Sequence, residues 1–271
     1  MQNLKLIFNF YLHASIHVAF AVIAFYKVTC ISLNIPETRN LVLVLFFGTI
    51  VMYNFMKYGS RAKGYFIVKS KYEKLIQIIS FIAGSFLIFF LVKLSIDNLI
   101  FLGMLVIISL LYILPFTRKG ENLRSFANLK VYAVSLVWSG STVLLPFSEN
   151  LSLINFDVWI VFLQRFILVI VLILPFEIRD MKSDAADLIT IPRNLGIKKT
   201  KKLGYLLLVV LILLELFKTN FQIEQLIVLF ISMAVLSVLL KLSNTSRSFY
   251  FTAFWVESIP ILLWLLTLVF I

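Results

Sequence analysis

The chain has few charged residues, and acidic ones are especially scarce. Of its 271 residues, 14% are charged and 61% are hydrophobic, and the mean hydropathy is +1.02. A composition this apolar excludes a soluble globular protein, and the length excludes a single membrane anchor. The sequence also lacks segments of about ten residues that alternate between apolar and polar, which excludes a transmembrane β-barrel. We therefore expect a polytopic membrane protein that crosses the bilayer with helices.

Cysteine and histidine are almost absent. Cys30 is the single cysteine, so no disulfide or thiolate metal site can form within the chain, and its apolar surroundings predict a packed thiol. The two histidines, His13 and His17, are four residues apart and would share one face of a helix. No acidic residue or cysteine in that segment completes a metal-ligand set, so we interpret them as polar contacts between helices.

Long apolar runs fill the rest of the chain, each about as long as the roughly 20 residues that cross a bilayer. Nine such runs predict spans at residues 6–33, 38–56, 75–94, 98–115, 127–147, 157–176, 203–219, 223–240 and 249–270. The first is longer than the apolar part of a signal peptide and has no cleavage site after it, so we expect it to be retained. No linker divides the chain. The prediction is an all-α bundle of nine transmembrane helices forming a single domain over residues 1–271.

The basic residues explain the net charge of +12. They are concentrated in the loops after the second, fourth, sixth and eighth predicted spans, and the opposite loops hold only Arg39, Lys93 and Lys218. The positive-inside rule then places the N-terminus in the cytoplasm and the C-terminus outside, in the inner membrane if the source is bacterial. Basic side chains on the inner face meet membrane lipid headgroups. No basic helix or aromatic platform suggests nucleic acid as a partner.

One short stretch gathers acidic residues. Glu177, Asp180, Asp184 and Asp187 are spaced three, four and three apart, so a helix would place their carboxylates along one stripe. A solvated helix end is one interpretation of this pattern. The other is a cation site, because hard ions such as Mg²⁺ bind carboxylate oxygens together with substrate phosphates.

The letters around this stripe, FEIRDMKSDAADLITIPRNLG, resemble the second aspartate-rich motif of the UbiA superfamily of intramembrane prenyltransferases. That motif is D-x-x-D-x-x-x-D followed by T-x-P/A-x-x-L-G, and Glu177 stands at the first acidic position. The other matching residues are Arg179, Asp180, Asp184, Thr190, Pro192, Leu195 and Gly196. A second segment is similar to the connection between the fourth and fifth helices of the family, where a tyrosine and basic residues face a diphosphate. Its nearest equivalents here are Tyr112, Arg118, Lys119 and Lys130.

The first aspartate-rich motif of the family, N-D-x-x-D-x-x-x-D, is degenerate in this chain. The corresponding letters are YNFMKYGSRA, in which Asn54 is kept and the aspartate positions hold Phe55, Tyr58 and Ala62. The cations Lys57, Arg61 and Lys63 occupy the same stretch. In the family the two motifs hold Mg²⁺ ions that bridge to a prenyl diphosphate, so half of that arrangement is missing here.

The resemblance implies nine helices around a central cavity and the transfer of an isoprenoid chain from a prenyl diphosphate to a hydrophobic quinone-precursor or lipid acceptor. It implies that Glu177, Asp180 and Asp184 bind Mg²⁺, the two aspartates also being catalytic. The substrate-binding residues it implies are Asn54, Lys57, Arg61, Tyr112, Lys119 and Arg179. Loss of the first motif leaves an alternative open, a noncatalytic lipid-binding or assembly protein on the same fold.

Some ionisable residues lie well inside predicted spans, where a charge is costly and usually has a partner or faces a cavity. They are Lys27, Arg165, Glu215 and Glu257. Lys27 can reach the outer surface. Arg165 lies deeper, and we expect it to pair with Glu215 or Glu257.

Overall fold

The computed structural model describes residues 2–59, 70–113, 129–183 and 190–271, and within these ranges it contains helices and no strand. The first half holds α1 (Gln2–His13), α2 (Ile16–Ser32), α3 (Arg39–Tyr58), α4 (Lys71–Leu91), α5 (Ile96–Ile113) and α6 (Leu129–Ser139). The second half holds α7 (Phe156–Asp180), α8 (Ile191–Leu195), α9 (Ile197–Glu215), α10 (Ile223–Leu242) and α11 (Ile259–Phe270). Two π-helical turns, η2 (Gly140–Leu144) and η5 (Phe251–Val256), extend α6 and precede α11, and η3 (Leu145–Phe147) and η4 (Leu151–Leu153) are single 3₁₀ turns. The all-α prediction is confirmed.

A helix lies at each of the nine predicted spans, but the count of nine is not confirmed in full. Six helical segments are long and apolar enough to cross a membrane, and α1 with α2 adds a seventh span that is bent by 58°. The apolar helix at 96–111 is shorter than a full span. Helix α9 has four lysines among its first six residues, which lower its hydropathy. The chain is thus a multi-pass membrane protein, while its orientation in the membrane stays a prediction.

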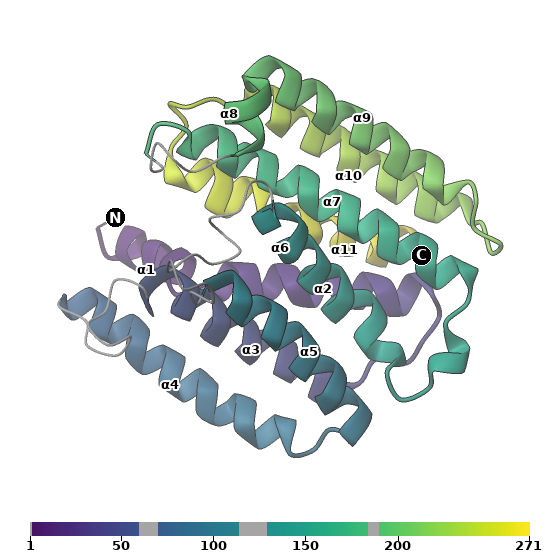
Figure 1. The fold of residues 1–271 in the computed structure, drawn as a ribbon, viewed down its shortest axis with the longest axis horizontal. Helices are drawn as coiled ribbons and strands as arrows, with labels where there is room; N and C mark the ends of the chain where they lie inside the picture. Colours follow the sequence, from purple (N-terminus) through teal and green to yellow (C-terminus); the bar gives the residue numbers. More distant parts are fainter. Residues whose placement is uncertain (1, 60–69, 114–128, 184–189) are drawn as a thin grey trace.

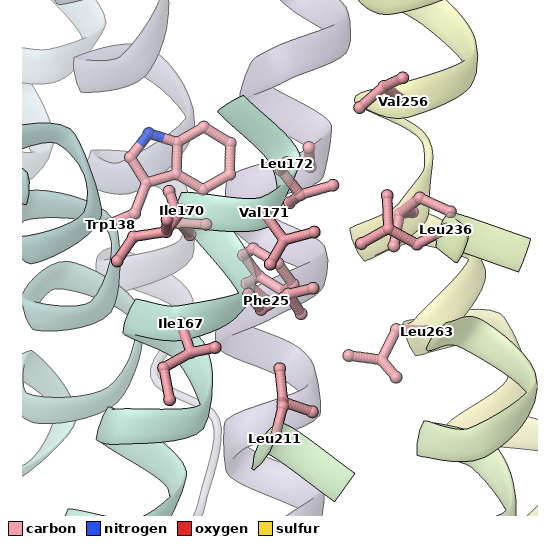
Figure 2. Close-up of a cluster of buried hydrophobic side chains, with 14 of the residues drawn as sticks. Phe25, Trp138, Ile167, Ile170, Val171, Leu172, Leu211, Leu236, Val256 and Leu263 are labelled. Carbon is pink, nitrogen blue, oxygen red and sulfur yellow. The ribbon is translucent and has the colours of Figure 1, made fainter. Parts of the chain in front are cut away.

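Helix α7 lies at the centre of the bundle (Figure 1). It is 25 residues long and packs against α6 and α9 on its two sides, with α10 and η2 also in contact. Figure 1 shows α4 at one edge of the molecule and the α9–α10 pair at the opposite edge. Apolar side chains of α7 such as Ile167 and Val171 meet Phe25 of α2 and Leu211 of α9 in the main core cluster (Figure 2). Because lipid surrounds the bundle, this central helix is where polar side chains can be kept away from the bilayer.

Gly204 permits the close packing of α9 on its neighbours. A Cβ added there would lie 2.4 Å from Leu240 Cδ2 of α10 and 3.1 Å from Leu174 Cδ1 of α7. Both leucines are fully buried, so neither has free space into which it can move. We expect Gly204→Leu to lower the free energy of unfolding by about 1 to 3 kcal/mol, as overpacked cores do. Thermal unfolding in detergent would measure this. Gly103→Leu is the matched control, because a Cβ at Gly103 meets nothing within 4 Å, and an equal loss in both variants would contradict the explanation.

Candidate functional site

A cavity of about 270 Å³ lies beside the C-terminal end of α7. Helices α3, α6, α7 and α11 contribute to its walls, so the ends of the second and sixth predicted spans meet there. Most of the wall is apolar or aromatic. The charged residues that line it are Lys130, Glu177, Asp180 and Glu257.

Glu177 joins three elements at this cavity. Its side chain is buried, and Oε1 lies 2.9 Å from Nζ of Lys130 on α6. Oε2 accepts a hydrogen bond of 3.2 Å from the backbone N–H of Ile191, at the start of α8. Gly196, directly after α8, has a φ of +79°, which a glycine adopts without strain and which lets the chain turn into α9. The T-x-P-x-x-L-G tail of the motif therefore holds α8 against the carboxylate of Glu177.

Asp180 and Arg179 form a bidentate ion pair at the end of α7. The distances are 2.6 Å from Arg179 Nε to Asp180 Oδ1 and 2.8 Å from Nη2 to Oδ2. Arg179 also donates to the hydroxyl of Thr252 and lies near the rings of Phe176 and Phe249. These contacts fix the guanidinium beside the cavity, where two parallel N–H donors hold a carboxylate with defined geometry.

Glu257 is a site residue that the sequence predicted only as a possible ion-pair partner of Arg165. It lies between η5 and α11, lines the cavity, and interacts electrostatically with Lys57 and Arg179. Lys57 of α3 in turn donates to Ser15 Oγ at 3.0 Å and lies over the ring of Tyr53. The expected pairing of Glu257 with Arg165 is therefore wrong. The sequence indicated only that an acidic residue lies inside a predicted span. Its partners became clear from the tertiary structure, in which η5, directly before Glu257, contacts α7.

The other predicted site residues divide into two groups. Asn54 is buried and binds neighbouring helices: its Oδ1 accepts from Ser15 Oγ at 2.8 Å, and its Nδ2 donates to Ala14 O and Ser80 Oγ. These bonds hold the α1–α2 bend, where Ser15 has a φ of 61°. The remaining ones, Arg61, Lys119, Asp184 and the side chain of Tyr112, lie outside the described residues. Their roles stay predictions.

A second cavity, of about 310 Å³, adjoins the first and is almost entirely apolar. The two share Tyr53, Val134 and Trp138 as lining residues. The Trp138 indole N–H donates to the Tyr53 hydroxyl at 2.8 Å, so this pair lies where the cavities adjoin. One cavity is lined by charged groups and the other by apolar side chains. Together they suit an amphipathic ligand with an ionic head and an apolar chain.

The described residues do not by themselves form a magnesium site. Among them, no three Asp, Glu, His or Cys side chains lie close enough to hold a metal. Glu177 already contacts Lys130, and both Asp180 oxygens are bonded to Arg179. A metal ion would therefore have to displace these cations, and the predicted third ligand, Asp184, lies outside the described residues. Mg²⁺ binding stays a prediction.

The histidine and cysteine interpretations agree with the structure. His17 contacts the Tyr11 hydroxyl at 2.8 Å and the Ser258 hydroxyl at 3.2 Å, which links α1 and α2 to the start of α11. His13 stacks on Phe249 with a centroid distance of 4.7 Å. Cys30 is buried in the main core cluster. The histidines contact neighbouring helices and Cys30 is a packed thiol, as the sequence predicted.

Comparison with known proteins identifies the fold. No protein-family profile matches the chain, and no curated protein sequence matches it. A solved structure of digeranylgeranylglyceryl phosphate synthase is 17% identical over 100% of this chain and 99% of its own, with a TM-score of 0.57. The apo structure of a UbiA homologue from Aeropyrum pernix K1 is 12% identical over 93% of this chain and 97% of its own, with a TM-score of 0.61. The chain has the UbiA fold, as its resemblance to the second aspartate-rich motif implied.

Proposed function

We propose that the protein is a membrane prenyltransferase that moves an isoprenoid chain from a prenyl diphosphate to a hydrophobic acceptor within the bilayer. The observation that carries this proposal is the pair of adjoining cavities, a charged one beside the C-terminal end of α7 and an apolar one next to it, lined mainly by α3, α5 and α6. The diphosphate would lie near Lys130 and Arg179, and the isoprenoid chain would extend past Tyr53 and Trp138 into the apolar cavity. The similar solved structures support the proposal at the level of the fold.

The proposed reaction breaks the bond between C1 of the isoprenoid and the diphosphate oxygen. The electron pair leaves with diphosphate, and positively charged side chains stabilise that negative charge as it develops. Aromatic faces such as those of Tyr53 and Trp138 stabilise positive charge on the isoprenoid. The acceptor then forms the new bond to C1 and loses a proton to a carboxylate of the cavity, a role that we propose for Glu257.

A noncatalytic lipid-binding or assembly protein is the second candidate, and a specific observation favours it. Each acidic residue of the cavity has a basic neighbour. Lys130 forms an ion pair with Glu177, Arg179 forms one with Asp180, and Lys57 interacts electrostatically with Glu257. The place of the first aspartate-rich motif holds Lys57 in a stretch without acids. A cavity balanced in this way can hold a lipid without ionising a diphosphate.

A product assay distinguishes the two candidates. Purified protein in lipid nanodiscs would be incubated with labelled prenyl diphosphates of several chain lengths, a panel of quinone-precursor and lipid acceptors, and Mg²⁺. Transfer of the label to an acceptor supports the enzyme. Saturable binding of the labelled compound without any product, over the whole panel, supports the lipid-binding protein and contradicts the proposed reaction.

The basic residues of the site should determine diphosphate affinity. A charge-assisted hydrogen bond to phosphate contributes about 1.5 to 3 kcal/mol, so we expect Lys130→Ala and Lys57→Ala each to weaken binding about tenfold or more. Isothermal titration with a short prenyl diphosphate, with and without Mg²⁺, would measure this. Lys71→Ala is the matched control, because Lys71 is exposed at the start of α4. Small and equal effects in all three variants would show that these lysines serve only topology.

A further inference from the structure

A second buried polar cluster lies on the other half of α7. Its centre is Arg165, which is 4% exposed and lies N-terminal to Glu177 by about 18 Å at the helical rise of ~1.5 Å per residue. The cluster also includes Gln164 of α7, Glu215 and Lys218 at the end of α9, and Gln225 of α10. The proposed transfer reaction uses none of these side chains.

Arg165 has no acidic partner. Its guanidinium lies 3.9 Å from the centre of the Phe25 ring, and Nη2 donates one long hydrogen bond of 3.4 Å to Thr29. Nη1 is buried and makes no hydrogen bond, and in the described part of the chain no carboxylate forms an ion pair with this arginine. The expected pairing with Glu215 is therefore wrong, as is the one with Glu257.

Glu215 is unavailable because it is already neutralised. Its Oε1 accepts from Lys218 Nζ at 2.8 Å, and its Oε2 accepts from Gln164 Nε2 at 2.9 Å. Lys218 also donates to Gln225 Oε1 at 3.0 Å. The charges of Lys218 and Glu215 cancel, so the cluster has a net charge of one positive unit, which comes from Arg165. A buried, uncompensated charge inside a membrane bundle is costly and usually has a partner.

A small cavity adjoins this excess charge. Its volume is about 50 Å³, and its polar lining includes Arg165, Gln164, Glu215, Lys218 and Gln225. The amide donors of Gln164 and Gln225 already bind backbone carbonyls or other side chains. Arg165 Nη1 is a buried donor without a partner, which suits a ligand that accepts hydrogen bonds. At roughly 10 to 15 Å³ for each water-sized centre, the cavity holds a single small ion with water and is too small for a lipid headgroup.

We propose that this cavity binds a small monovalent inorganic anion, such as chloride, against Nη1 of Arg165. The anion supplies the negative charge that the protein does not, and the cation–π contact with Phe25 holds the guanidinium in place. The site is independent of the transfer reaction, because it lies on the other half of α7 and shares no lining residue with the two cavities of the candidate functional site.

Thermal unfolding in halide and in gluconate, at equal ionic strength, tests the proposal. Chloride or bromide should raise the unfolding temperature of the wild-type protein saturably, by about 2 to 4 °C for a site that is well occupied, whereas the larger gluconate should not. Arg165→Met should abolish the halide-dependent rise. Lys27→Met is the control that should keep it, since Lys27 pairs with Glu37 near the C-terminal end of α2.

Anomalous diffraction from crystals of the wild-type protein grown in bromide gives a second, independent readout. A bromide peak within hydrogen-bonding distance of Arg165 Nη1 supports the proposal, and it decides the question by itself if Arg165→Met does not fold. Density for water alone at that position overturns the proposal. An equal halide response in the wild type and in Arg165→Met also overturns it, because the anion would then act elsewhere.

Discussion

Asp180→Asn is expected to lower the rate of prenyl transfer by about 100-fold, with little change in stability. The substitution keeps the shape of the side chain and removes its charge. Asparagine cannot form the bidentate ion pair with Arg179, so the guanidinium loses the partner that fixes it beside the cavity. Removing one preorganised electrostatic contact from an active site typically costs a factor of about 10² to 10³ in rate.

Single-turnover transfer of labelled isoprenoid in nanodiscs would measure this effect, together with the Mg²⁺ dependence of the rate. Asp97→Asn provides the matched control, since Asp97 is an exposed carboxylate in the first turn of α5. If Asp180→Asn changed the rate less than threefold, or no more than the control, Asp180 would be part of a solvated helix end and not of an active site.

Removing one partner of the buried Glu215–Lys218 pair should have the largest effect on stability. Both side chains are almost fully buried, and Lys218 Nζ lies 2.8 Å from Glu215 Oε1. In Glu215→Leu the ammonium group remains buried without its counter-charge, next to the uncompensated Arg165. Breaking a buried ion pair from one side typically costs about 3 to 5 kcal/mol, so we expect a loss of at least about 3 kcal/mol in the free energy of unfolding.

The double variant Glu215→Leu/Lys218→Met separates charge from packing. Replacing both partners by apolar side chains is often neutral, so it should recover most of the stability lost in Glu215→Leu. Reversible unfolding in mixed micelles would compare the wild type, both single variants, the double variant and the exposed control Glu224→Leu. A double variant as unstable as the sum of its single variants would show that the two charges are not coupled.

Local patterns in the sequence predicted the architecture and part of the site. A helix lies at each of the nine apolar runs, because a lipid-facing helix must be apolar along its whole length whatever its neighbours are. The spacing of Glu177 and Asp180 placed their carboxylates on one stripe of α7, since helical periodicity alone fixes that relation. The predicted number of full spans was not confirmed in full. Lysines at the start of α9 lower its hydropathy, and a bend at Ser15 divides the first predicted span into α1 and α2.

By itself, the sequence determined that this is a helical membrane protein with an acidic stripe that resembles a UbiA motif. Only the tertiary structure decided which charges meet. Glu177 forms an ion pair with Lys130, and Glu257 lies near Lys57 and Arg179. Arg165 lacks the carboxylate partner that we expected for it. The physical reason is that hydropathy and helical spacing are local properties, whereas an ion pair between helices depends on their relative rotation and depth. Those are set by side-chain packing between residues far apart in the chain, such as Phe25, Val171 and Leu211 around α7.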